Sequence, residues 1–224
     1  MLNPDIKPLC ILGCGDVFEA LRHNLSAYGR DSKSVFFHDF DGVDSLAGQA
    51  DKVIAQWNPR EHDLFMAVDN NAMNHARLEL YGRARLKGFR LVSLVHNKAH
   101  LDEGVYVADN VWIGPGALLS HGCRIESNSF IHANARLDAR VQVASHVWIA
   151  QGARLGADSV IGSHSIVGTD VILKPATKFG HHVVIEAPGS HGGEWASGTF
   201  FESTAENAAM MIGPGYTFTR QAPQ

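Results

Sequence analysis

An apolar residue stands at every sixth position from Leu101 to Ile185 without a break. These positions divide residues 101–190 into fifteen blocks of six, and the fifth position of each block is small or β-branched. A period of six cannot keep one face of an α-helix apolar, because that helix repeats every ~3.6 residues. Hexapeptide repeats of this kind are typical of a β-helix. The pattern predicts a solenoid in which three blocks form one triangular coil, with about five coils in all.

The first 95 residues alternate short apolar runs with amphipathic stretches. Strands are expected at 9–12, 34–38, 64–68 and 91–95, and helices at 16–28, 45–57 and 71–87. This alternation predicts a small parallel α/β sheet. The glycine turn Gly13-Cys14-Gly15 follows the first strand. It is compatible with a phosphate site at a helix N-terminus and equally with a tight turn that binds no ligand.

Three segments follow from these patterns. Residues 1–95 are expected to form the α/β domain and residues 96–190 the β-helix. Residues 191–224 lose the six-residue repeat but keep several glycines and aromatic residues. This tail is too apolar for a plain disordered segment. We expect it to pack along the β-helix or on a neighbouring subunit.

One column of stacked positions is apolar throughout. Its members are the last residues of every third block, namely Trp112, Phe130, Trp148, Ile166 and Val184. These side chains should point outward, because the next residue of each points into the coil. An exposed apolar patch of this size usually marks an interface. The column therefore predicts self-association, most simply as a homotrimer.

A second column contains Asn110, Asn128, His146, His164 and His182. Imidazole is a common metal ligand, so three histidines in register raise the possibility of a metal site. Coils stack at about the spacing of strands, ~4.8 Å, and parallel imidazoles then aim their nitrogens in the same direction. This argument favours a structural or interface ladder, and no metal is expected. A metal-dependent hydratase that uses this column stays open as an alternative.

Composition narrows the function classes. The formal net charge of −4 gives no sign of a nucleic-acid-binding surface. The first residues contain no apolar run typical of a secretory signal, and no run approaches the length of a membrane span. The three cysteines, Cys10, Cys14 and Cys123, are scattered and odd in number. They are interpreted as reduced thiols of a cytoplasmic protein.

The segments GALLSHGCRI and IHANARLDA within the repeat resemble the hexapeptide acyltransferases. The front half is similar to the same subfamily at ILGCG, FFHDFDG, LFMAVDNN and KGFRLVSLVH. Members of that subfamily place a Rossmann-like domain before a left-handed β-helix. They include bacterial sugar-nucleotide N-acetyltransferases and sialic-acid O-acetyltransferases. The resemblance covers nearly all of residues 9–190 and implies this fold for the chain.

Site residues follow from the resemblance by position. His121 matches the catalytic histidine of the family. Asn134 and Ala135 lie at positions where, in family members, the next turn of the β-helix approaches the acyl thioester. Ala139 occupies the position of a family glycine whose amide helps to hold the thioester. The resemblance also implies nucleotide-binding roles for residues of the front domain, namely Gly13, Gly15, Asp39, Asn70 and Asn71.

Two departures from the family pattern concern the catalytic centre. The acidic residue that follows the histidine in the family is Gly122 here, and a second histidine of the family is Phe130. The resemblance implies an enzyme that transfers an acetyl or other acyl group from acyl-CoA to an amino group of a nucleotide-linked sugar, for surface polysaccharide synthesis. His121 would be its general base, at a subunit interface of a homotrimer. A sugar O-acetyltransferase, an inactive sugar-nucleotide binder and a purely structural trimer remain alternatives.

Overall fold

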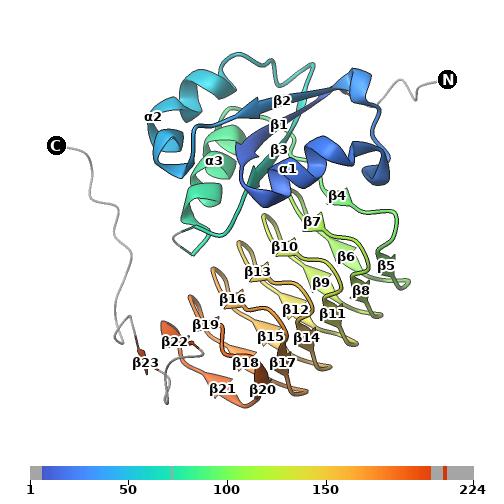
Figure 1. The fold of residues 1–224 in the computed structure, drawn as a ribbon, viewed down its shortest axis with the longest axis vertical. Coiled ribbons are helices and arrows are strands. Elements are labelled where there is room, and N and C mark those ends of the chain that lie inside the picture. Colours follow the sequence, from blue (N-terminus) through green and yellow to red (C-terminus); the bar gives the residue numbers. More distant parts are fainter. Residues whose placement is uncertain (1–6, 72, 203–208, 211–224) are drawn as a thin grey trace.

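The computed structural model describes residues 7–71, 73–202 and 209–210. It has the two parts that the sequence predicts, a front α/β domain and a β-solenoid (Figure 1). The front domain contains a parallel sheet of order β2-β1-β3. Its elements are β1 (Leu9–Cys14), α1 (Asp16–His23), the 3₁₀ turns Leu25–Tyr28 and Ser32–Ser34, β2 (Val35–Asp39), α2 (Val43–Ile54), β3 (Asp63–Val68) and α3 (His75–Leu86).

The sheet of the front domain is covered on both faces. Every residue of β1 and β3 is buried, as near-continuous apolar runs in parallel sheets require. Alternate residues of these strands point to opposite sides, so that α2 and α3 pack on the face with Cys10 and Leu12, and α1 packs on the face with Leu9 and Ile11. The prediction of a parallel α/β domain is confirmed.

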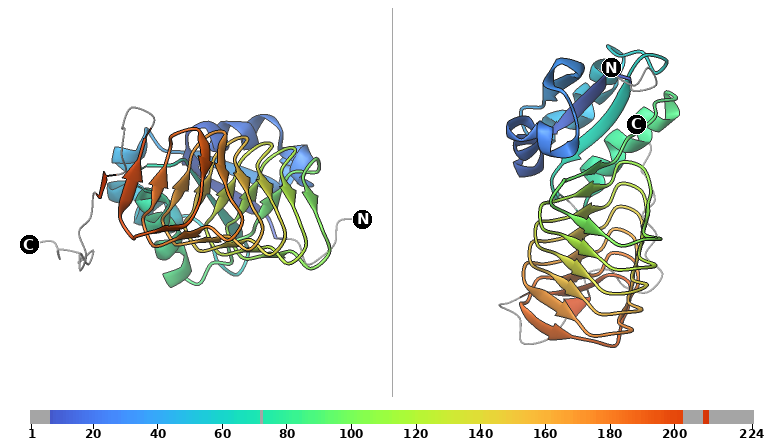
Figure 2. Two further views of the ribbon diagram at one scale, coloured as in Figure 1. Left: turned by 90° about the horizontal axis from the view of Figure 1, so that it is seen from below. Right: turned by 90° about the vertical axis from the view of Figure 1, so that its right-hand side faces the viewer.

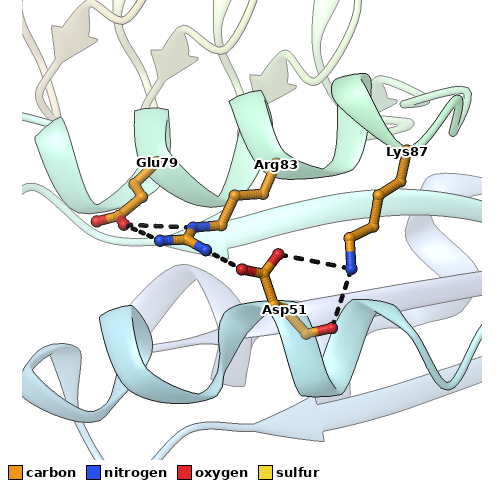
Figure 3. Close-up of polar contacts among 4 residues, drawn as sticks. All are labelled: Asp51, Glu79, Arg83 and Lys87. Carbon is orange, nitrogen blue, oxygen red and sulfur yellow. Dashed lines mark hydrogen bonds and ion pairs between the residues drawn. The ribbon is translucent and has the colours of Figure 1, made fainter.

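Helices α2 and α3 are joined by a cluster of surface charges (Figure 3). Arg83 pairs with Glu79 one turn earlier on α3, at 2.6 Å, and reaches across to Asp51 on α2. The Lys87 Nζ donates to the backbone oxygen of Asp51 at 3.2 Å. Exposed ion pairs contribute little individually. The apolar contacts beneath them therefore supply most of the stability of this helix pair.

The prediction that residues 91–95 form a fourth strand of the front sheet is wrong. Leu91 makes only an isolated bridge with Leu64 of β3. The next strand, β4 (Leu94–Val95), pairs with Trp112 and Ile113 and so belongs to the solenoid. The solenoid thus begins before the repeat is visible in the sequence.

The solenoid has three parallel faces built from very short strands. The first sheet contains β4, β7 (Trp112–Ile113), β10 (Phe130–Ile131), β13 (Trp148–Ile149), β16 (Ile166–Val167), β19 (Val184–Ile185), β22 (Thr199–Phe201) and β23 (Ala209–Met210). The second contains β5 (His100–Leu101), β8 (Leu118–Leu119), β11 (Arg136–Leu137), β14 (Arg154–Leu155), β17 (Val171–Leu173) and β20 (Gly189–His191). The third contains β6 (Tyr106–Val107), β9 (Arg124–Ile125), β12 (Gln142–Val143), β15 (Val160–Ile161), β18 (Lys178–Phe179) and β21 (Glu194–Trp195).

Three corners connect these sheets in every coil. Corner A runs from the first sheet to the second, for example at 132–135. Corner B runs from the second to the third, for example at 120–123, and corner C returns from the third to the first, for example at 126–129. The apolar first and fifth positions of the blocks fill the interior, as predicted. The fourth position of each block from 101 to 184 also has positive φ, and Gly, Asn, Asp and His are common there.

The solenoid has about six turns, one more than predicted. Strand β21 pairs with β18, and β22 pairs with β19, although the six-residue pattern has ended by then. Strands β21 and β22 therefore continue the solenoid beyond residue 190. The tail residues 203–208 and 211–224 lie outside the described residues.

The apolar column on the first sheet is not an exposed face. Trp112, Phe130, Ile166 and Val184 are all buried. The front domain lies over the first coils, and the last coils extend beyond it (Figures 1 and 2). Phe130 stacks on Phe65 of β3 with ring centres 5.9 Å apart. The column is an interface within one chain, so the premise from which the homotrimer was predicted is wrong.

A buried guanidinium joins the two domains. Arg77 of α3 is fully buried, and its charge lies 3.9 Å from the ring centre of Phe130. It donates hydrogen bonds to the backbone oxygens of Val68 and Asn128 and to the Asn74 side chain. Burial lowers the pKa of Arg77 to about 9, against the attraction of the Asp69 carboxylate. The carbonyl contacts compensate for taking this charge out of water.

The Asn and His column at corner C forms the other half of the domain interface. Asn110 exchanges hydrogen bonds with the backbone of Met66 and donates to Asn128 at 2.7 Å. Asn128 lies 2.9 Å from the Nδ1 of His146, which stacks on His164 with ring centres 4.7 Å apart. This ladder connects corner C to the backbone of β3.

Replacing Arg77 by methionine should weaken the domain interface. The methionine keeps much of the side-chain volume but leaves two buried carbonyl groups and one amide without their donor, at about 1–3 kcal/mol for each group left unsatisfied. We expect the free energy of unfolding, measured in urea, to fall by roughly 2–4 kcal/mol. Arg85→Met on the same helix is the control, because Arg85 makes an exposed ion pair. Equal losses in the two variants would contradict the role of Arg77.

The buried histidines should make stability depend on pH. Burial, reinforced by Arg77, lowers the pKa of His146 to about 4, and burial beside other histidines lowers that of His164 to about 3. Below about pH 6.5 the unfolded chain binds protons that the folded chain excludes, so stability is lost as the pH falls. Each histidine contributes at most about 1.4 kcal/mol per pH unit to this slope.

Urea unfolding between pH 7.5 and pH 4.5 measures this dependence. His146→Asn places at this corner the residue found in the two coils above. It should flatten the slope without preventing folding. A slope that is unchanged in the variant, or stability that rises as the pH falls, would be inconsistent with this assignment.

Candidate functional site

A cavity of about 570 Å³ lies where the front domain meets the first sheet and corner A. The front domain contributes the first turns of α1 and the residue that follows β3. The solenoid contributes two tryptophans of the first sheet and the corner beside them. Its lining residues are Asp16, Val17, Ala20, His23, Asn24, Tyr28, Asp69, His96, Trp112, Pro115, His132, Ala133, Trp148, Ala150, Gln151 and Thr169.

The solenoid wall of this cavity is aromatic. His132 lies between Trp112 and Trp148, with ring centres 4.9 Å and 4.0 Å away. The Trp112 indole donates a hydrogen bond to the Tyr28 hydroxyl at 3.1 Å, which fixes its orientation. Flat apolar surfaces with a few polar groups are typical of small-molecule sites.

His132 is the neutral polar group of this wall. Burial, and to a smaller extent the charge of Arg77, lowers its pKa to about 3. Its Nε2 has no hydrogen-bond partner among the residues that the structure describes. A neutral imidazole with such a low pKa is a poor proton acceptor but can hydrogen-bond a ligand. Sequence reasoning missed His132, although it follows a member of the apolar column by two positions.

The front wall is acidic. Asp69 accepts hydrogen bonds from the backbone N–H groups of Asp16 at 2.5 Å and Val17 at 3.1 Å. Desolvation raises the pKa of Asp69, against these two hydrogen bonds. A carboxylate of the chain itself therefore occupies the N-terminus of α1, where a phosphate would otherwise be favoured.

Both predicted nucleotide-binding glycines have a packing role in this turn. A Cβ on Gly13 would overlap the backbone oxygen of Ala67 on the neighbouring strand. Gly15 has φ of 98°, and a Cβ there would meet the Asp69 carboxylate. The glycines are thus explained by close strand packing and by the turn into α1.

The remaining predicted residues of the front domain lie near the same edge of the sheet. Asp39 ends β2 and forms an exposed ion pair with Arg22 at 3.4 Å. Asn70 and Asn71 follow β3, and Asn70 lines a second cavity of about 420 Å³ beside Trp148. The structure therefore brings the predicted front-domain residues together at the carboxyl edge of the sheet, where ligands of α/β domains bind.

His121 lies on a different corner from the main cavity. It is exposed on corner B and lines neither of these two cavities. Its backbone N–H donates to the Asp102 carboxylate at 3.1 Å, and the other oxygen of Asp102 lies 2.9 Å from the His100 Nε2. Asp102 thus contacts the main chain of His121, while its side-chain interaction is with His100.

The predicted acyl-CoA residues are distributed over two corners. Asn134 is exposed on corner A, two residues after His132. Ala135 is fully buried in the solenoid core, so only its backbone is available to a ligand. Ala139 lies on corner B, one coil below His121. In a single chain, His121 and Ala139 share corner B, and Asn134 follows Ala133, which lines the cavity at corner A.

Residues 104–139 match the family model described as bacterial transferase hexapeptide (six repeats). No curated protein sequence matches the chain. Among the residues that the structure describes, no helix is long and apolar enough to cross a membrane.

The fold is similar to that of several solved structures. PerB from Caulobacter crescentus, in complex with CoA and GDP-perosamine, has a TM-score of 0.72 at 19% identity, covering 87% of this chain and 93% of PerB. The acetyltransferase domain of PglB from Neisseria gonorrhoeae, in complex with acetyl coenzyme A, has a TM-score of 0.58 at 18% identity, covering 87% and 95%. WeeI from Acinetobacter baumannii AYE has a TM-score of 0.58 at 14% identity, covering 90% and 99%. The repeat of the chain is thus similar to bacterial hexapeptide transferases over residues 104–139, and the chain has the two-part fold of these structures.

Proposed function

We propose that this chain transfers an acyl group, by default acetyl, from acyl-CoA to the amino group of a nucleotide-linked sugar. The observation that carries the proposal is the cavity between the front domain and the solenoid, with aromatic rings on one wall and carboxylates on the other. The similar structures of PerB and PglB, which hold CoA with GDP-perosamine and acetyl coenzyme A respectively, support the same class of reaction.

The walls of the cavity suit an amino sugar. Trp112 and Trp148 offer flat apolar faces to a sugar ring or a base. The carboxylates of Asp16 and Asp69 attract an ammonium group but repel phosphate. The sugar end of the ligand would therefore lie at the acidic wall, and its diphosphate would lie away from the start of α1. His132 would donate or accept a hydrogen bond to a sugar hydroxyl.

The chemical step requires a proton acceptor. The bound ammonium group first loses one proton to solvent. The neutral amine nitrogen then attacks the thioester carbonyl, the carbon–sulfur bond breaks, and CoA leaves as a thiolate while the nitrogen loses a second proton to a base. A neutral imidazole suits this transfer at neutral pH. We assign it to His121, with the backbone of Asn134, Ala135 and Ala139 near the acyl-CoA. The imidazolium then returns the proton to the thiolate.

This assignment requires a second copy of the chain, because His121 lies on corner B and the cavity adjoins corner A. In the proposed homotrimer, corner B of one subunit meets the cavity of its neighbour. An inactive sugar-nucleotide binder is the second candidate. It is favoured by Gly122 at the usual acidic position and by the engagement of Asp102 with His100.

Replacing His121 by alanine tests the general base. We expect kcat with acetyl-CoA and an amino-sugar nucleotide to fall by roughly 10²–10⁴, the usual contribution of such a group. Binding of CoA should be retained. His181→Ser is the control, since His181 is another exposed corner histidine and serine occupies its position in the coil above. Unchanged turnover in His121→Ala would refute the assignment, and absence of turnover in the unmodified protein across a panel of amino-sugar nucleotides would favour the inactive binder.

Replacing Trp148 tests the cavity independently of the base. Trp148→Ala removes one stacking surface, worth about 1–3 kcal/mol for a stacked ring, and should raise the KM for the nucleotide sugar by roughly tenfold. Trp148→Phe should retain most of the affinity, and the Kd for CoA should not change in either variant. An unaltered KM in Trp148→Ala would place the sugar nucleotide elsewhere.

A further inference from the structure

Three histidines from both domains meet at corner C. His75 is the first residue of α3, whereas His164 and His182 occupy the same corner position in consecutive coils. Their ring centres are 4.7 Å apart for His75 and His164, 4.8 Å for His164 and His182, and 5.8 Å for His75 and His182. The start of α3 thus brings a third imidazole beside the two of the solenoid.

The three imidazoles bring ring nitrogens close to one another. One donor atom from each residue lies within 4.8 Å of the other two. The centre of any such triangle lies no more than about 2.8 Å from each donor, and zinc binds imidazole nitrogen at about 2.0–2.1 Å. An inward shift of roughly 0.7 Å for each nitrogen would complete the coordination. The three rings are nearly parallel, with interplanar angles of 13°, 5° and 9°. The side chains must therefore also rotate to aim their lone pairs at one ion.

The protonation states also suit a metal. Burial lowers the pKa of all three imidazoles, so each is neutral at neutral pH, as a ligand must be. The Nδ1 of His164 lies 3.3 Å from the backbone oxygen of Met73. A carbonyl can only accept a hydrogen bond, so this contact places the proton on Nδ1 and leaves Nε2 as the electron-pair donor. Metal-binding histidines commonly donate their second ring nitrogen to a carbonyl in this way.

The backbone adds a second reason to connect these histidines with a ligand. His164 and His182 have φ values of 60° and 56°. Asparagine occupies the same corner position in two earlier coils, at 110 and 128. Asparagine adopts this left-handed conformation readily. The change from asparagine to histidine therefore serves something other than the turn itself.

We propose that His75, His164 and His182 bind one divalent transition-metal ion, of which Zn²⁺ is the representative, and that this ion joins the front domain to the solenoid. Three nitrogen ligands suit Zn²⁺ and Co²⁺, whereas Mg²⁺ prefers oxygen. A water molecule would take the fourth position. In the sequence the column presents its histidines in a line, which disfavours a shared ion. His75 makes the arrangement a triangle.

Titration of tag-free, full-length protein after treatment with a chelator tests the site. We expect Co²⁺ to bind at one ion per chain with the visible absorption of four-coordinate cobalt, and Zn²⁺ to displace it. Zn²⁺ should raise the thermal midpoint, because an ion that binds only the folded state stabilises it. Mg²⁺ should do neither. Absence of this cobalt spectrum and of a Zn²⁺-dependent midpoint shift would overturn the proposal.

Matched variants assign the ligands. His164→Asn and His182→Asn install the residue that the same corner already accepts in earlier coils, so both should fold, as circular dichroism would verify. Each substitution should weaken Zn²⁺ binding by at least about tenfold, because loss of a residue that only hydrogen-bonds to a metal ligand already costs that much affinity. His181→Ser changes an exposed neighbouring histidine and should leave the affinity unchanged. Equal affinity in His164→Asn, His182→Asn and the unmodified protein would overturn the assignment.

Discussion

The structure depends on the burial of one face of the solenoid beneath the front domain. The aromatic column of the first sheet would be costly to expose, and β3 and α3 cover it with Phe65 and Arg77. At corner C, Asn110 and Asn128 are fully buried beneath the front domain. The covering is incomplete toward corner A, where α1 stands away from Trp112 and Trp148 and leaves the cavity. The packing of the front domain on the first sheet therefore both stabilises the domain interface and forms the cavity beside that interface.

The solenoid could be predicted from the sequence because its determinants are local. In each coil the apolar residue at the first position of a block points into the interior, and the same positions of the neighbouring coils are also apolar. The left-handed conformation at the fourth position was also visible in principle, as glycine, asparagine and aspartate at positions such as Gly116, Asn134 and Asp170. The docking of the front domain was not predictable in this way. It depends on contacts between distant segments, and Arg77 has the sequence context of an ordinary exposed helix residue.

The candidate site could be predicted only in part, for the same reason. Motif residues such as Gly13 and Asn70 were assigned through the resemblance to a family, and they lie near one edge of the sheet because parallel strands end at a common edge. The aromatic wall was found as a column but assigned to self-association, because the sequence does not show which surface covers it. His132 was missed, since an isolated histidine beside a buried position has no distinguishing pattern. Asp69 was missed because its partners, the first amides of α1, lie more than fifty residues earlier.

The covered first sheet also restricts how copies of the chain could assemble. Association through the part of that sheet that the front domain covers would have to displace the front domain. Large apolar side chains are exposed instead on the other two sheets, where Tyr106, Val160 and Ile172 are 43%, 38% and 39% exposed. Tyr106 and Val160 belong to the third sheet and Ile172 to the second, and corner B lies between these sheets. An assembly that buries these residues would also bring corner B, which carries His121, against a second subunit.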